Sequence, residues 1–411
     1  MAHTVLTLNN IAQSGLNEFD PEKYTITQSS NTPHAIIVRS QNMRNYSLPD
    51  SLEIVGRAGA GTNNIPVDEC TKRGIPVMNT PGANANAVKE LVLASMLLAC
   101  RNILPAWNYV NTLDVSNDGL GPLVEKNKKR FTGSELPGRT LAVIGLGNIG
   151  IEIANSAVEL GMKVIGFDPA ITVRSAWKLS ANVHHADSLA EALSQADFIS
   201  LHVPLIEKTK NIINENTIRT MKTGVILLNF AREGIIDNAA LLNAIEQKKI
   251  AYYACDFPNN LFKGRPNIIC LPHLGASTKE AEENCAIMIA RQVQSYIEDG
   301  QIIHSINFPD VKLPRSDGYR ISITNRNVPN MVAQISTLLS EANINIIDMI
   351  NKSKGDIAYN LMDLDKTIST DIIENLTAID GVIRSRRLFS INNEPMHTSL
   401  GAAVTKHTAS V

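Results

Sequence analysis

The sequence lacks several features that would place it in a specialised class of protein. Its 411 residues carry 38 lysines and arginines against 40 aspartates and glutamates, so neither sign of charge dominates and no nucleic-acid partner is indicated. The longest apolar run is interrupted by Lys89 and Glu90 and is too short to span a bilayer. The first residues show no charged segment followed by an apolar run, so we expect no secretory signal. What remains is a globular chain long enough for two or three domains.

Cysteine is scarce, and its spacing shows no pairing. The five cysteines are odd in number, form no C-x-x-C pair and lie mostly in apolar runs. This pattern is typical of reduced thiols in a core, so we expect a cytoplasmic protein, and we predict no metal site. The cysteines are Cys70, Cys100, Cys255, Cys270 and Cys285.

Short β-branched runs alternate with helical patterns along most of the chain, as in parallel βαβ units. The strongest helical patterns cover residues 86–102 and 276–300. Between residues 103 and 137 the chain carries glycine, proline and a basic run, which we interpret as a connection. Residues 301–317 have the composition of a linker, and a small α+β unit follows.

A glycine triplet ends one of the predicted strands. The stretch "LAVIGLGNIG" places Gly145, Gly147 and Gly150 in the pattern G-x-G-x-x-G, and Asp168 ends the next strand. In such a motif the first glycine makes a tight turn, the second admits a pyrophosphate and the third lets helix and strand pack closely. Asp168 would accept hydrogen bonds from the adenosine ribose and repel a 2′-phosphate. The sequence therefore predicts NAD as the cofactor rather than NADP.

The glycine motif comes late in the chain, which suggests an inserted domain. If the dinucleotide domain interrupts another domain, the two long helices are the natural crossings and a cleft lies between the lobes. We expect a substrate domain from residues 1–102 and 275–305 and a dinucleotide domain from residues 103–274. We expect a regulatory unit at residues 318–392 and a flexible tail at residues 393–411.

Several stretches, in order, resemble those of one family. They are "RAGAGTNN", "RGIPVMNTPGANANAVKELVLA", "GLGNIG", "LHVPL", "LLNFAREGIID" and "LPHLGAST", and together they are similar to the D-2-hydroxyacid dehydrogenase family. The resemblance implies an α/β fold in which a Rossmann-type cofactor domain is inserted in a flavodoxin-like substrate domain. It also implies cofactor contacts at Gly145, Gly147, Asn148, Ile149, Gly150, Asp168, His202, Val203, Pro204, Phe230, Ala231, Asp256, Gly275 and Ala276.

Hydride transfer from a secondary alcohol needs a base for the hydroxyl proton and a cation for the carboxylate and the nascent carbonyl. His273 follows a strand, and imidazole titrates in the useful range. Arg232 also follows a strand, and a guanidinium can grip a carboxylate with two hydrogen bonds. The resemblance assigns His273 as acid/base and Arg232 as the substrate-binding and polarising group.

One family feature is missing. The family normally pairs its histidine with a glutamate in a "DVFExEP"-like segment, which fixes the tautomer, but here the segment reads "CDFPNNLFKG". Asn259 or Asn260 stands where the glutamate would fall. Three explanations stay open: a different carboxylate such as Glu282 or Glu283, a weaker asparagine partner, or an enzyme without a dyad that prefers higher pH.

Substrate residues are indicated mainly by the resemblance. Arg39 and Ser40 would bind a phosphate, with Arg57 and Asn79 as neighbours. A glycine-rich loop with Ala60 and Gly61 could hold a carboxylate through its N–H groups.

The C-terminal unit resembles an ACT domain, a small ferredoxin-like amino-acid-binding module. Within the family, this addition implies members that oxidise 3-phosphoglycerate in the phosphorylated route to serine. The resemblance assigns effector contacts to Asn325, Asn327 and Asn345, although asparagine is also common in turns and caps. Because ACT domains act in pairs, we expect a homo-oligomer, a dimer or tetramer, with feedback by serine.

Two other interpretations stay open. The chain could oxidise an unphosphorylated 2-hydroxy acid such as glycerate, which the ACT unit argues against. It could also be an NAD-sensing binding protein of the same fold, weakened in catalysis by the missing glutamate. The presence of both Arg232 and His273 argues against that second alternative.

Overall fold

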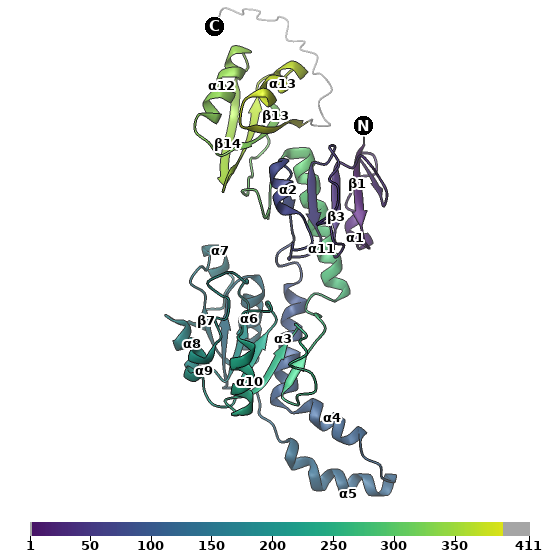
Figure 1. The fold of residues 1–411 in the computed structure, drawn as a ribbon, viewed down its shortest axis with the longest axis vertical. Helices are drawn as coiled ribbons and strands as arrows, with labels where there is room; N and C mark the ends of the chain where they lie inside the picture. The colour runs from purple at the N-terminus through teal and green to yellow at the C-terminus, as the bar shows by residue number, and fades with distance from the viewer. Residues whose placement is uncertain (1, 389–411) are drawn as a thin grey trace, which may run out of the picture.

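The computed structural model describes residues 2–388, which form three units stacked along the long axis of the molecule (Figure 1). The N-terminal unit (residues 2–84 and 276–317) lies in the middle. The dinucleotide unit (residues 85–275) lies below it, and the C-terminal unit (residues 318–388) lies above it. The expected tail at residues 393–411 lies outside the described residues. Within the described part of the chain, no helix combines the length and apolarity needed to cross a membrane.

The N-terminal unit is built on a five-stranded parallel sheet with the order β2-β1-β3-β4-β5. This order is that of flavodoxin-like folds and confirms the predicted class. The central strand β3 is buried along its whole length, which explains its uninterrupted apolar sequence. The elements are β1 (His3–Leu8), α1 (Gln13–Leu16), β2 (Tyr24–Thr27), β3 (Ala35–Val38), β4 (Ile54–Arg57), α2 (Val67–Lys72), β5 (Val77–Met78) and α11 (Lys279–Asp299).

The dinucleotide unit contains a seven-stranded parallel sheet with the order β12-β11-β10-β9-β6-β7-β8. The strand order reverses beside β6, and ligands of such sheets bind at the carboxyl ends of the strands near this point. Its strands are β6 (Thr140–Ile144), β7 (Lys163–Phe167), β8 (Val183–His185), β9 (Phe198–Leu201), β10 (Val225–Asn229), β11 (Ile250–Cys255) and β12 (Ile268–Cys270). Its outer helices are α6 (Asn148–Glu159), α7 (Val173–Ala176), α8 (Leu189–Gln195), α9 (Glu215–Thr220) and α10 (Asn238–Glu246).

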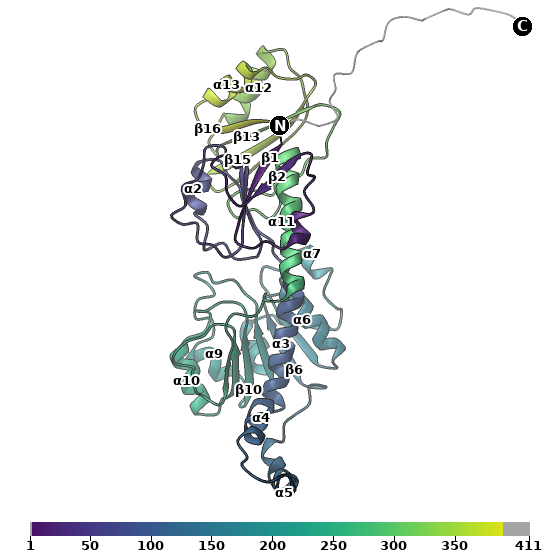
Figure 2. The ribbon, with the colours of Figure 1, turned by 90° about the vertical axis from the view of Figure 1, so that its right-hand side faces the viewer.

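Two features of this unit differ from expectation. Helix α3 (Ala85–Cys100) shares a core with α6 and the large sheet, although its residues were expected in the substrate domain. Its buried side chains, such as Val92 and Met96, face the dinucleotide sheet. The expected connection after it contains helices α4 (Ile103–Asn111) and α5 (Asn117–Asn127) and the 3-10 turn η1 (Lys128–Phe131), which project from the end of the molecule (Figure 2).

The C-terminal unit is an antiparallel sheet with the order β14-β15-β13-β16. With one helix in each crossover, this is the ferredoxin-like topology expected of an ACT domain. The elements are β13 (Tyr319–Arg326), α12 (Met331–Glu341), β14 (Ile346–Lys354), β15 (Ile357–Leu364), α13 (Thr370–Ala378) and β16 (Val382–Leu388).

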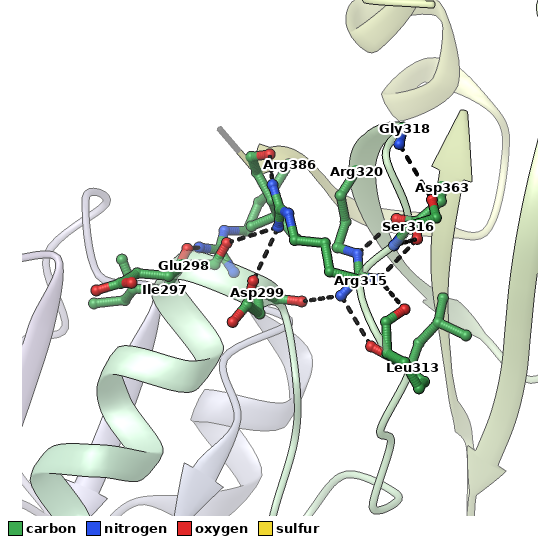
Figure 3. A network of polar contacts seen from close by, with 12 residues as sticks. Ile297, Glu298, Asp299, Leu313, Arg315, Ser316, Gly318, Arg320, Asp363 and Arg386 are labelled. Carbon is green, nitrogen blue, oxygen red and sulfur yellow. Dashed lines mark hydrogen bonds and ion pairs between the residues drawn. The ribbon is translucent and has the colours of Figure 1, made fainter. Parts of the chain in front are cut away.

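The C-terminal unit packs against the N-terminal unit around the end of α11 (Figure 3). Arg315 of the N-terminal unit donates to the Leu388 carbonyl at 3.2 Å, and Arg386 of the C-terminal unit donates to the Ile297 carbonyl at 3.4 Å. Arg320 of the C-terminal unit is fully buried and donates to the Asp299 carbonyl at 3.4 Å. Within its own unit it also donates to both carboxylate oxygens of Asp363, at 2.6 and 2.8 Å. The carbonyl oxygens at a helix C-terminus favour cations, so arginines satisfy the end of α11 while apolar side chains of both units share one core.

Candidate active site

A cavity of about 850 Å³ lies where the N-terminal and dinucleotide units meet. Both units line it with the carboxyl ends of their strands, because parallel strands in each sheet end at the same edge. The cavity brings together most of the predicted substrate and catalytic residues. Its lining includes Arg39, Ser40, Arg57, Ala60, Gly61, Arg232, His273 and Ala276.

The glycine loop has the shape that a dinucleotide requires. Gly145 has a φ of +96°, and a Cβ at Gly150 would lie 2.0 Å from the Gly145 carbonyl oxygen. A Cβ at Gly147 would meet nothing within 4 Å, so the backbone there is open to a ligand at the N-terminus of α6, where Asn148 and Ile149 begin the helix. Such a helix end binds a pyrophosphate through its free N–H groups and dipole.

Asp168 lies directly after β7 and supports this loop. Its Oδ2 accepts a hydrogen bond from the Leu146 N–H at 2.8 Å, and its Oδ1 accepts one from Ala170 at 2.9 Å. Each carboxylate oxygen can accept a further bond, so Asp168 remains able to take a ribose hydroxyl. The donors and open backbone of this region therefore fit NAD.

His202 follows β9 and packs beside the glycine loop. Its Nε2 lies 2.7 Å from Ser200 Oγ, a contact the sequence did not reveal, while its enclosed Nδ1 has no partner in the described structure. Burial lowers the pKa of His202 to about 3, so the ring is neutral. Val203 approaches Gly145, and Pro204 continues the loop.

Arg232 lies in a turn after β10 that Asn229 holds. The Asn229 side chain, 2% exposed, donates to the Arg232 carbonyl at 2.9 Å and accepts from the Ala231 N–H at 3.2 Å. Phe230 and Ala231 are buried in this turn. Arg232 Nη1 donates to the Ala231 carbonyl at 2.6 Å, which leaves other guanidinium N–H groups for a ligand in the cavity.

His273 lies in a loop (residues 271–277, the His273 loop) that follows β12. It has a φ of +57°, a conformation that non-glycine residues seldom adopt. Asp256, 2% exposed, accepts from the Leu274 and Gly275 N–H groups, each at 2.6 Å. The ring of Phe257 contacts the imidazole edge to face at 5.4 Å. Backbone geometry and these contacts orient His273.

None of the proposed acidic or amide partners bonds to His273 in the described structure. Glu282 pairs with Arg39 at 2.7 Å and Glu283 with Lys279 at 3.8 Å. Asn259 accepts a hydrogen bond from Leu261 within its own turn. The described contacts therefore lend no support to the first two explanations, and the interpretation without a dyad stays a prediction.

The substrate end of the cavity is strongly basic. Arg57 donates through Nε to the Arg39 carbonyl at 3.2 Å. Its guanidinium packs closely against Gly59, since a Cβ at Gly59 would lie only 2.2 Å from Arg57 Nη1. Burial, together with the neighbouring charges of Arg39 and Arg232, lowers the pKa of Arg57.

Asn79 is placed differently from expectation. It is absent from the cavity lining and donates to the Ala60 carbonyl at 2.5 Å. Asn79 therefore holds the backbone of the glycine-rich loop and does not line the cavity itself.

The predicted effector residues do not form one cluster within a chain. Asn325 is 1% exposed, and its side chain bonds to Asn360 at 2.7 Å inside the sheet. Asn327 is exposed and donates to the Gly355 carbonyl. Asn345 precedes β14 and lies near the opposite end of the sheet, because the register pairs Ile346 with Leu364.

Comparison with known proteins supports the family. The profile of the "D-isomer specific 2-hydroxyacid dehydrogenase, NAD binding domain" matches residues 93–275. A D-3-phosphoglycerate dehydrogenase of Haemophilus influenzae is 35% identical over 348 residues, which are 82% of this chain and 81% of the relative. The Escherichia coli K12 enzyme of the same name is 30% identical over 381 residues, 89% of each chain.

Other relatives are longer or match in fold alone. A D-3-phosphoglycerate dehydrogenase of Bacillus subtilis is 39% identical over 284 residues, 67% of this chain, and the chain spans about half the length of that relative (51%). An NAD⁺-bound 3-phosphoglycerate dehydrogenase of Entamoeba histolytica shares the fold with a TM-score of 0.57 at 23% identity, covering 75% of this chain and 99% of that one.

Proposed function

Because the chain belongs to the D-isomer-specific 2-hydroxyacid dehydrogenase family, we propose that it oxidises 3-phosphoglycerate to 3-phosphohydroxypyruvate with NAD. This is the first step of the phosphorylated route to serine. One observation carries the proposal: His273, Arg232, Arg39 and Arg57 line a single cavity. The substrate has a carboxylate at one end and a phosphate at the other, and this cavity offers cations for both.

The described side chains divide the chemistry between them. When bound, NAD supplies the hydride acceptor. Arg232 grips the substrate carboxylate and polarises the carbonyl that forms. A nitrogen of His273 takes the hydroxyl proton. The backbone N–H groups near Ala60 and Gly61 add donors for the carboxylate.

Arg39 and Ser40 lie at the phosphate end, with Arg57 beside them. Guanidinium groups match phosphate oxygens in a planar fork. We expect a phosphate reaching Arg39 to displace Glu282, which pairs with Nη1 of this arginine in the structure. The substrate phosphate therefore takes the place of the Glu282 carboxylate, at a site where an arginine already binds an anion.

A substrate comparison tests the assignment. The expected result is NADH formation with 3-phosphoglycerate well above that with D-glycerate or D-lactate. A His273→Asn variant should lose at least 100-fold in kcat while it still binds NADH. Activity restricted to the unphosphorylated acids would favour the alternative 2-hydroxyacid dehydrogenase. NADH binding without turnover of any acid would favour an NAD-sensing binding protein.

We further propose amino-acid control, self-association and a cytoplasmic location. Exposed Asn327, in the turn between β13 and α12, supports an amino-acid site with L-serine as the effector, formed between paired C-terminal units. Self-association into dimers or tetramers is supported by apolar side chains on α4, among them Trp107 at 65% exposure. Thermal shift with serine and sedimentation of a Trp107→Glu variant test the first two; cell fractionation tests the third.

A further inference from the structure

Two cysteines that the proposed reaction does not use lie side by side in the dinucleotide sheet. Cys255 ends β11 and Cys270 ends β12, and the register pairs the two residues directly. Their Sγ atoms are 3.6 Å apart, and each lies 3.6 Å from the Phe257 carbonyl oxygen. Among the described cysteines no other pair has such a contact.

This pair lies at the base of the His273 loop. Asp256, next to Cys255, holds the Leu274 and Gly275 N–H groups. Phe257, whose carbonyl both thiols contact, packs its ring against His273. Any rearrangement of the two thiols therefore acts on the contacts that orient the proposed acid/base.

We propose that Cys255 and Cys270 form a redox-sensitive dithiol, which a low-molecular-weight disulfide converts to an intramolecular disulfide that slows turnover. Neighbouring parallel strands lie about 4.8 Å apart, within the range of Cα separations that a disulfide spans. The sulfur atoms must approach by roughly 1.5 Å to reach bonding distance. Side-chain rotation supplies most of this approach, since the two residues already face each other.

The exchange proceeds in two balanced steps. The sulfur of half-buried Cys270 attacks the small disulfide. A mixed disulfide forms, and one small thiol leaves with the proton of Cys270. The sulfur of Cys255 then attacks the mixed disulfide at Cys270, the internal S–S bond forms, and a second small thiol leaves with the proton of Cys255. Two protein thiols are oxidised and one small disulfide is reduced.

The environment fixes which cysteine reacts first. Cys255 is fully buried, and burial raises the pKa of its thiol. Since the thiolate is the nucleophile, Cys255 acts only after Cys270 has brought the disulfide within reach. After closure, the Phe257 carbonyl loses two S–H contacts, and the turn between Asp256 and the His273 loop shifts.

The test incubates the full chain with oxidised glutathione, blocks free thiols with N-ethylmaleimide and analyses peptides by mass spectrometry. We expect a Cys255–Cys270 crosslink, a fall from five titratable thiols to three, and at least a threefold loss of kcat that dithiothreitol reverses. The thiol count does not depend on the substrate assignment.

Matched variants complete the design. Cys270→Ala and Cys255→Ala should each abolish both the crosslink and the reversible loss of activity, whereas Cys100→Ala, a buried thiol on α3, should keep both. If Cys255→Ala fails to fold, Cys270→Ala alone decides, because its side chain is half-buried. A glutathione adduct without a crosslink, a crosslink that leaves kcat unchanged, or an equal loss in Cys270→Ala would overturn the proposal.

Discussion

The pairing of Arg39 with Glu282 gives a quantitative prediction about substrate recognition. The two side chains meet at 2.7 Å, with 28% and 45% of their surfaces exposed. At this exposure an ion pair contributes about 0.2–1 kcal/mol after solvent screening. When a phosphate displaces Glu282 from Arg39, the free energy of this ion pair is lost. Replacing Glu282 by glutamine should therefore tighten phosphate binding by up to about fivefold.

The assay measures KM for 3-phosphoglycerate and for D-glycerate by NADH absorbance at low ionic strength. The Glu282→Gln variant should lower the first KM by about 1.4- to fivefold and leave the second unchanged, and 0.5 M salt should reduce the difference. Glu283→Gln is the matched control, because Glu283 pairs with Lys279 outside the cavity. A KM for 3-phosphoglycerate that rises, or that falls equally in both variants, would refute the role of Arg39.

Three further predictions follow from the dinucleotide unit. Gly150→Ala should weaken NADH binding more than tenfold by fluorescence titration, because a Cβ there meets a carbonyl oxygen at 2.0 Å; Gly121→Ala, with nothing within 4 Å, should not. His202 has a folded pKa of about 3, below its unfolded value near 6.5. Its contribution to stability is therefore present above pH 6.5 and lost as pH falls toward 3. Between pH 7 and 5, the free energy of unfolding measured in urea should fall by about 1–2 kcal/mol more in the parent than in a His202→Gln variant. Asp256→Asn keeps only one of the two side-chain oxygens that accept hydrogen bonds from the His273 loop. Tm should therefore fall by several degrees and kcat by about tenfold. A kcat equal to the parent's would show that this carboxylate does not position the His273 loop.

The sequence predicted the elements whose signals are local. Short β-branched runs predicted most strands of both parallel sheets, but not β2 or β8, and the long helices α3 and α11 were found to within a few residues. Gly145 and Gly150 were recognised because close backbone approach needs glycine, which a spacing can reveal. The helices α4 and α5 were missed since Pro105, Pro122 and glycines mask their periodicity.

The residues that were missed or misplaced depend on side-chain contacts that the residue pattern does not reveal, whether the partners are near or distant in sequence. Nothing in the sequence shows that Ser200 bonds to His202 or that Asn229 fixes the turn of Arg232. Glu282 was a candidate partner of His273 on sequence, yet in α11 it pairs with Arg39, which follows β3. Asn325 was expected to contact an effector but is buried, because β13 lies between β15 and β16 and is buried at every residue from 320 to 325.

In the proposed enzyme, one cavity combines an acid/base, a carboxylate-binding arginine and a phosphate site. The most direct measurement compares NADH formation at 340 nm with 3-phosphoglycerate, D-glycerate and D-lactate in parallel, for the parent and for His273→Asn. We expect strong preference for 3-phosphoglycerate in the parent and almost no NADH formation in the variant. Equal rates on all three acids, or full activity in the variant, would contradict this expectation.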